Sequence, residues 1–312
     1  MSGVGRRRFG LALVAALCAL TACSSGGQQS AAPPSAAASS AASSAPSSSS
    51  APSGSSAAPS AGLPTPAHVV VVVFENKDAG AVVGASAAPY LTSLAAQGAA
   101  FTDAHGVTHP SQPNYLALFS GSTHGVRGDK CPKQFAAPNL AAQLRAAGRT
   151  FTGFSEALPA AGYTGCRSGK YARKHNPWVD FPALPASVNQ PLSAFPHDLA
   201  RLPTVAFVVP DLCSDMHDCP VSTGDAWARA HLSPYVAWAR THDSLLIVTF
   251  DEDEGSEANH IPTFLVGPMV RPGTSAQRID HYGVLRTIEA MYGLPPLGSA
   301  ATARPLTGIW TR

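Results

Sequence analysis

Continuous apolar runs along the chain predict buried strands. Residues 68–74 form a β-branched run without the alternation of a half-exposed strand, which is typical of a strand in the middle of a parallel sheet. Residues 204–209 and 244–250 repeat this pattern, and shorter or more peripheral strands are predicted at 150–154 and 263–266. These runs indicate a sheet with a buried centre.

Helical segments lie between the predicted strands. Pro in the first turn and Gly just past the last residue are typical of helix ends. These signals favour helices at 89–97, 114–120, 139–147, 234–241 and 282–292. Strands that alternate with helices predict an α/β fold, a single domain in which a mostly parallel central sheet carries helices on both faces. The Pro-rich stretch 166–203 has weak periodicity, and we expect it to lie outside this scaffold, near the site.

The first 22 residues have the layout of an export signal. Three arginines at 6–8 precede an apolar run from residue 9 to 20, which is too short to span a bilayer. The segment Leu20-Thr21-Ala22-Cys23 resembles the lipobox of bacterial lipoproteins, in which the Cys becomes the acylated N-terminus. We therefore expect a lipoprotein signal peptide at 1–22 and a lipid on Cys23 that anchors the protein to the outer face of the bacterial cell membrane. Ordinary cleavage with secretion is the alternative, and the arginines fit the general and the twin-arginine export routes equally well.

Composition separates a tether from a folded domain. From residue 24 to 66, 39 of 43 residues are Ser, Ala, Pro or Gly and none is charged, so we expect 23–66 to be a disordered tether. Residues 67–312 are long enough for one substantial domain, which we interpret as catalytic. Over these residues, 18 Lys and Arg stand against 19 Asp and Glu. A net charge of −1 argues against nucleic acid as a partner, because it provides no basic footprint.

Four cysteines lie in the predicted domain. An even number in an exported protein favours two disulfides. Proximity along the chain favours pairing Cys131 with Cys166 and Cys213 with Cys219. A zinc site is the alternative, which the lack of a Cys-x-x-Cys pair disfavours.

Acidic and amide side chains follow the three strongest predicted strands. Ligands bind beyond the carboxyl ends of strands in open α/β sheets. Any one such acid is most simply a cap or turn residue, but several at one edge would repel each other unless a cation lies among them. We therefore expect a cation site at this edge. The residues are Glu75 with Asn76, Asp211, and Asp251 with Glu252.

Ser111 lies between two prolines, just before an apolar run that predicts a helix. At a helix N-terminus, the positive end of the helix dipole and the free N–H groups favour an alkoxide and bind phosphate oxygens. Taken alone, however, a Ser in this place is more simply a helix cap.

Seven sequence blocks occur in order between about residues 68 and 294. One block is His-Pro-Ser-x-Pro-Asn-Tyr at 109–115, and the others are at 75–76, 174–177, 211–219, 224–227, 249–252 and 280–282. Together they resemble the bacterial phosphoesterase family, which holds secreted acid phosphatases and phospholipases C within the alkaline-phosphatase-like superfamily. The ordered set is far more specific than any single block.

The resemblance implies a Ser nucleophile, bound to a divalent metal, that attacks phosphorus and gives a covalent phospho-enzyme for water to hydrolyse. Ser111 matches the nucleophile, and Asn114 matches an Asn that donates to a phosphoryl oxygen. A bound cation would lower the pKa of the hydroxyl and neutralise the phosphoryl charge. A mostly oxygen shell suits Mg, Ca or Mn, while nearby His donors leave Zn or Fe open. The matching metal positions are Asn76, Ser111, Asp251 and Glu252, with Glu75 as a ligand or its support.

Histidines in the matching blocks are candidates for substrate chemistry. A lone His is more often structural, but His217, His260 and His281 each stand beside an acid or amide. We expect these three to orient phosphate oxygens, protonate the leaving oxygen or complete a second metal site. Protonated His would strengthen phosphate binding below about pH 6.5, which fits an acid phosphatase. The candidates for substrate contact are His109, Lys174 and His175, although a loop salt bridge would also explain the last two.

Other functions fit the motifs less well. A sulfatase of the same superfamily needs Arg where this chain has Tyr115, and residues 153–157 lack the final Gly of an esterase nucleophile elbow. We therefore expect an exported, metal-dependent acid phosphatase, monomeric, that hydrolyses phosphate monoesters through a phospho-serine intermediate. A phospholipase C-type phosphodiesterase is the alternative, and a non-catalytic surface lipoprotein is less favoured.

Overall fold

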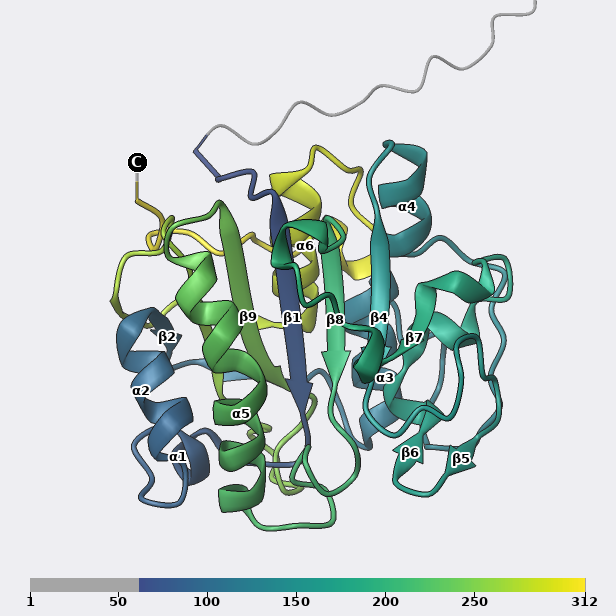
Figure 1. Ribbon diagram of the computed structural model, residues 1–312, viewed down its shortest axis with the longest axis horizontal. Helices are drawn as coiled ribbons and strands as arrows, with labels where there is room; N and C mark the ends of the chain where they lie inside the picture. The colour runs from purple at the N-terminus through teal and green to yellow at the C-terminus, as the bar shows by residue number, and fades with distance from the viewer. Residues whose placement is uncertain (1–61, 312) are drawn as a thin grey trace, which may run out of the picture. The chain divides into compact units, whose positions relative to one another are not determined.

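The computed structural model describes residues 62–311. An eight-stranded sheet forms its centre, with the strand order β11-β2-β10-β9-β1-β8-β4-β7 (Figure 1). Its strands are β1 (His68–Phe74), β2 (Ala99–Phe101), β4 (Phe151–Ser155), β7 (Asn189–Pro191), β8 (Val205–Val209), β9 (Ser244–Phe250), β10 (Thr263–Val266) and β11 (Gly273–Ser275). Two further pairs lie outside it: β3 (Ala104–His105) with β12 (Ile279–Asp280), and β5 (Arg167–Ser168) with β6 (Tyr171–Ala172).

The sheet is parallel through its centre. The neighbours β9, β1, β8, β4 and β7 pair in parallel, while β10 runs antiparallel to both β9 and β2. Every residue of β1 after His68 is buried, which explains an apolar run without alternation. The five predicted strands are confirmed, each within one residue of its expected bounds.

Helices cover both faces of the sheet. In the view of Figure 1, α2 (Pro89–Gln97) and α5 (Val221–Ala239) lie in front, while α3 (Ser111–Ser120) and α6 (His281–Met291) lie behind. The shorter helices are α1 (Ala79–Val82) and α4 (Leu140–Ala146). The predicted fold class, a single α/β domain with helices on both faces, is confirmed.

The predicted start of the helix at 234–241 is wrong, because α5 begins at Val221 and contains Pro234 in its interior. The prediction treats Pro234 as a first-turn residue, since proline lacks the N–H that an interior position donates. Buried side chains recur at helical spacing before and after it, among them Trp227, Leu232 and Tyr235. Burying this stripe against the sheet outweighs the loss of one backbone hydrogen bond.

The other four predicted helices are confirmed within three residues at each end. The largest shift is in α3, which begins at Ser111 instead of 114. Pro113 is compatible with this first turn, because a nitrogen there has no intrahelical partner to lose. The shift places Ser111 on the helix itself, as its first residue.

The stretch 166–203 lies mostly outside the sheet, as expected, but it also supplies an edge strand. Residues Asn189–Pro191 form β7, which pairs in parallel with β4. The sequence gives no apolar pattern there, because an edge strand of three residues buries little of its surface.

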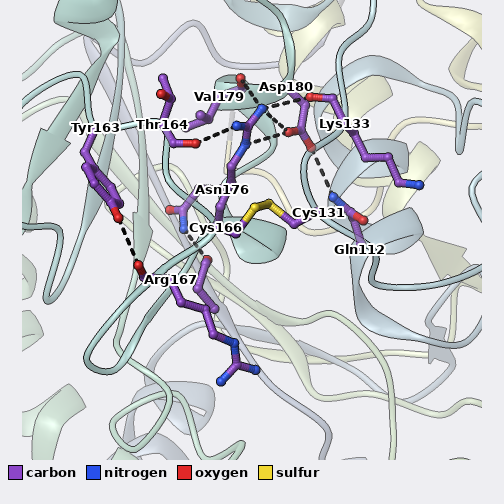
Figure 2. Close-up of a disulfide and its surroundings, with 12 residues drawn as sticks. Gln112, Cys131, Lys133, Tyr163, Thr164, Cys166, Arg167, Asn176, Val179 and Asp180 are labelled. Atoms are coloured by element: carbon purple, nitrogen blue, oxygen red, sulfur yellow. Dashed lines mark hydrogen bonds and ion pairs between the residues drawn. A yellow bond between two sulfur atoms is a disulfide. The ribbon is translucent and has the colours of Figure 1, made fainter. Parts of the chain in front are cut away.

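Both predicted disulfides are confirmed. The Cα atoms of Cys131 and Cys166 are 5.8 Å apart, and those of Cys213 and Cys219 are 4.7 Å apart. The first disulfide fastens the loop after α3 to the start of the 166–203 stretch (Figure 2). The second closes a short loop that follows β8.

The packed domain starts slightly before the predicted boundary at residue 67. Thr65 Oγ1 donates to the carbonyl of Met291 at 3.0 Å, and the Tyr292 hydroxyl donates to the carbonyl of Pro66 at 3.0 Å. The predicted signal peptide, Cys23 and the tether up to residue 61 lie outside the described residues. Within residues 62–311, no helix combines the length and apolar character needed to cross a membrane.

Candidate active site

The carboxyl ends of neighbouring strands bring the predicted acids to one edge of the sheet. Glu75 follows β1, and Asp251 and Glu252 follow β9, which pairs with β1 along its whole length. The loop after β8, on the other side of β1, carries Asp215, whose carbonyl accepts a hydrogen bond from the Glu75 backbone N–H at 2.8 Å. Four carboxylates therefore converge where parallel strands end.

Ser111 points its hydroxyl into this group of acids. Its Oγ lies 3.0 Å from Glu75 Oε2 and 3.1 Å from Glu252 Oε1, so its single proton has two carboxylate acceptors within reach. The residue is 2% exposed. A buried hydroxyl between two carboxylates is the arrangement that the nucleophile hypothesis requires, because an acceptor for its proton is already in contact.

Asn76 ties the same acids together. Its backbone N–H donates to Asp251 Oδ1 at 3.0 Å, and its side-chain amide donates to Glu75 Oε2 at 3.0 Å. Asn76 has φ 51°, in the left-handed region that Asn tolerates better than most residues. The five predicted metal positions, Glu75, Asn76, Ser111, Asp251 and Glu252, are thus brought together by direct contacts.

Burial and mutual repulsion hold the acids toward their protonated forms. Burial, followed by the nearby Asp251 and Asp215 carboxylates, raises the pKa of Glu75 well above its usual value. Burial is also the main cause that raises the pKa of Asp215 to about 8 and that of Asp251 to about 7. Such a group is unfavourable as a set of free anions, and a cation among them would offset the repulsion.

His175 and Asp215 extend the group on one side. One donor atom from each of Glu75, His175 and Asp215 lies within 4.8 Å of the others, and all three residues are buried. Among the described residues, His175 Nε2, Asp215 Oδ2 and Asp251 Oδ2 are buried without a hydrogen-bond partner. Burial lowers the pKa of His175 well below its usual value, which keeps the ring neutral and able to coordinate. These side chains fit a metal ion, which would satisfy the unpartnered atoms.

Tyr115 and Asp215 are site residues that the sequence analysis did not single out, although both lie in matching blocks. The Tyr115 hydroxyl donates to Glu75 Oε1, and its ring stacks on His175 with centroids 5.2 Å apart. Asp215 lies within the loop closed by Cys213 and Cys219. An acid inside a short disulfide loop after a buried strand is the sequence signal that would have found it.

The other predicted histidines differ in what they contact. His109 contacts the Glu252 carboxylate through Nδ1, and that hydrogen bond raises its pKa against the opposing effect of burial. His281 Nε2 lies 2.6 Å from the Asp251 carbonyl, where it supports the backbone of that acid. The ring of His217 is 5.9 Å from that of His175. His260 lies instead beside His105, with centroids 5.4 Å apart.

Asn114 faces the loop before α3. Its Oδ1 accepts hydrogen bonds from the N–H groups of Val107 and Thr108, at 2.9 and 3.0 Å, and its Nδ2 donates to the Thr108 carbonyl at 2.7 Å. Both ends of the amide are therefore engaged by backbone, and the side chain is fully buried. In this structure Asn114 fixes the path of the chain into Ser111.

Lys174 reaches the start of α3 through an acidic side chain. Its Nζ donates to Asp129 Oδ2 at 2.8 Å, while Asp129 Oδ1 accepts from the Gln112 backbone N–H at 3.0 Å. Gln112 is also held through its side chain, which donates to Asp180 Oδ2 at 3.2 Å (Figure 2). The residue after Ser111 is thus fastened from two directions.

A cavity of about 750 Å³ lies on the α5 face of the sheet, apart from this group. Its walls are mainly apolar, with Leu192, Phe195, Trp227 and Tyr235 among them, and they include none of the predicted site residues. The group of acids around Ser111 is therefore separate from this cavity.

Comparison with known proteins identifies the family of this chain. Residues 81–295 match the Phosphoesterase family. The chain is 52% identical over 254 residues to the phosphatidylinositol-3-phosphatase of Mycobacterium tuberculosis. This match covers 80% of this chain and 85% of that protein. The chain is 34% identical to the phosphate-repressible acid phosphatase of Penicillium chrysogenum, over 67% of this chain, and 32% identical to an acid phosphatase of Aspergillus fumigatus, over 66%. The matches span only about half of the two fungal proteins, 55% and 51%.

Solved structures agree on the fold. A protein of the alkaline phosphatase superfamily from Vibrio parahaemolyticus superposes with a TM-score of 0.53 at 15% identity, over 78% of this chain and 71% of that one. The phosphonate monoester hydrolase of Silicibacter pomeroyi gives 0.51 at 13% identity, over 77% and 76%.

The chain belongs to the Phosphoesterase family. It is a hydrolase of phosphoric ester bonds.

Proposed function

We propose that this protein is a metal-dependent acid phosphatase that hydrolyses phosphate monoesters through a phospho-serine intermediate. The observation that carries the proposal is the buried Ser111 hydroxyl, 3.0 Å from Glu75 Oε2 and 3.1 Å from Glu252 Oε1 at the carboxyl edge of the sheet. The relatives named above are all phosphatases, which supports a monoester over a diester substrate.

Each residue of the group has a role in this proposal. Ser111 Oγ gives its proton to Glu75 or Glu252 and forms the bond to phosphorus as the bond from phosphorus to the leaving oxygen breaks. Water then breaks the bond between Oγ and phosphorus, which restores the hydroxyl and releases inorganic phosphate. The groups available to orient phosphate oxygens are His109, which contacts Glu252, His175, which contacts Glu75, His217, which lies beside His175, and Lys174, which pairs with Asp129. Asn114 holds the backbone that leads to Ser111. His260 has the weakest structural support, because its contacts lie around His105.

A divalent metal ion would be held by Glu75, Asn76, Asp251 and Glu252, with Ser111 as the ligand that reacts and His175 and Asp215 beside them. When bound, it supplies a Lewis acid that lowers the pKa of the Ser111 hydroxyl and neutralises charge on the phosphoryl group. His281 supports this set through the Asp251 backbone. A predominantly oxygen shell favours Mg, Mn or Ca, and the His175 donor keeps Zn and Fe among the metals to be tested.

The purified protein is expected to hydrolyse p-nitrophenyl phosphate at least about a hundredfold faster, by kcat/KM, than bis(p-nitrophenyl) phosphate, because two negatively charged phosphoryl oxygens are needed to use the cationic groups around Ser111 fully. Phosphatidylinositol 3-phosphate and phosphatidylcholine, presented in vesicles, extend the comparison to lipids, with release of phosphate or phosphocholine as the readout. A preference for the diesters would instead favour the phospholipase C alternative.

We further propose that the protein is exported and held on the outer face of the cell membrane by a lipid on Cys23. Two disulfides support an oxidising compartment, and the basic, apolar and small-residue segments before Cys23 support the signal. In a bacterial host that processes lipoproteins, the wild type is expected to partition into the detergent phase, and Cys23→Ser into the aqueous phase. Equal partitioning of both proteins would exclude the anchor.

A further inference from the structure

Asp129, in the loop that follows α3, contacts the residue next to the proposed nucleophile. One oxygen of its carboxylate accepts the Gln112 backbone N–H at 3.0 Å, and the other accepts from Lys174 Nζ at 2.8 Å. Gln112 follows Ser111 in the chain, so the N–H that Asp129 takes is the first one after the reactive hydroxyl. The side chains of Lys174 and Asp129 are 12% and 29% exposed, so solvent reaches this pair.

The Gln112 N–H and the Lys174 ammonium are donors of the kind that bind a phosphoryl group. N–H groups in the first turn of a helix and a Lys ammonium both bind phosphate oxygens, and α3 offers few alternatives because Pro113 has no N–H. A carboxylate that bridges the two donors with its two oxygens therefore holds them in the way that two oxygens of a phosphate would. Asp129 has the charge and geometry of a substrate mimic.

The loop is fastened so that this carboxylate stays in place. Asp129 is two residues before Cys131, whose disulfide to Cys166 joins the loop to the segment that carries Lys174 (Figure 2). Beside the disulfide, Arg173 donates to the Lys133 carbonyl at 2.8 Å and pairs with Asp180 at 2.9 Å. Asp180 in turn accepts from the Gln112 side chain. The position of Asp129 is thus built by covalent and buried polar contacts on both sides.

Resting on the phosphatase activity proposed above, we propose that Asp129 is an intramolecular competitor for the substrate phosphate. In the free protein its carboxylate covers the Gln112 N–H and the Lys174 ammonium, and a bound phosphoryl group displaces it. The competition raises the KM for phosphate esters and weakens inhibition by inorganic phosphate, the product.

The experiment compares Asp129→Asn and Asp129→Ala with the wild type. If the carboxylate covers the donors about nine-tenths of the time, both variants should lower the KM for p-nitrophenyl phosphate and the Ki of inorganic phosphate by about tenfold, with kcat changed less than about threefold. Calorimetric titration of inorganic phosphate into Ser111→Ala and into Ser111→Ala with Asp129→Asn measures the same gain without turnover. Lys174→Met should weaken phosphate binding whether or not Asp129 is replaced.

Asp198→Asn is the matched control, because Asp198 caps a short 3-10 helix through the Ala200 N–H on the exposed surface. It should leave KM and Ki unchanged. Unchanged or weaker phosphate binding in both Asp129 variants, with circular dichroism that reports an intact fold, would overturn the competition and make Asp129 a support for Lys174. A wild type that neither hydrolyses monoesters nor binds phosphate would instead refute the proposed function itself.

Discussion

Replacing Ser111 with Ala is expected to reduce kcat for monoester hydrolysis by at least about a thousandfold while the fold is retained. The reason is that the hydroxyl has a unique position: it is the oxygen that lies between Glu75 and Glu252 at the point where β1 and β9 end. Without it, only water is available to attack phosphorus, and no covalent intermediate forms. Steady-state kinetics with p-nitrophenyl phosphate measure the loss.

Ser93→Ala is the matched control, because Ser93 is an exposed residue inside α2 and belongs to none of the matching blocks. It should keep full activity. Thermal unfolding of Ser111→Ala should lie within about 5 °C of the wild type, since the change removes one small polar group. A short incubation of the wild type with substrate at low pH, followed by mass spectrometry, should detect phosphate on the peptide that contains Ser111. Activity above about a tenth of wild type in Ser111→Ala would rule out the nucleophile.

The sequence was sufficient for the sheet and for the acids at its edge because both depend on local patterns. A β-branched run such as His68–Phe74 has few stable alternatives to a buried strand, and the residue after it must leave the sheet at the carboxyl edge. The position of Glu75 relative to Asp251 and Glu252 then follows from parallel pairing of β1 with β9. The family resemblance added Ser111, which local pattern alone could not separate from a helix cap.

Contacts that depend on folding of the 166–203 stretch could not be predicted in this way. The sequence placed His175 among the candidates for substrate contact, but it could not predict that the ring is buried between Glu75 and Asp215, at 3.3 Å from each. Asp129 had no distinguishing pattern, since a lone acid in a polar loop is ordinarily exposed. Its place beside Gln112 results from a disulfide that closes 35 residues and from the buried Arg173–Asp180 pair. The helix start predicted at Pro234 was wrong for a similar reason, because burial of apolar side chains distant from Pro234 determines where the helix begins.

Removal of divalent metal is expected to abolish activity, and reconstitution with one metal at a time should restore it. Chelation followed by dialysis should reduce kcat/KM by at least about a hundredfold, because Glu75, Asp215 and Asp251 would then repel each other and the Ser111 hydroxyl would keep its proton. Thermal unfolding gives a readout independent of turnover. Saturating the effective metal should raise the melting temperature by roughly 5–10 °C, since a ligand that binds only the folded state stabilises it.

Asp251→Asn separates the contribution of the metal to stability from that of the repulsion between carboxylates. Removing one of the buried, mutually repelling charges should make the metal-free variant at least as stable as the metal-free wild type, whereas the metal should stabilise the variant much less. Asp243→Asn is the matched control, because this exposed acid precedes β9 at the opposite edge of the sheet, directly before the strand that Asp251 follows. It should respond to metal like the wild type. Intact activity after chelation, or a full metal-dependent rise in melting temperature in Asp251→Asn, would mean that the acids at the sheet edge are not a metal site. Glu75 or Glu252 would then have to accept the Ser111 proton without help from a metal ion.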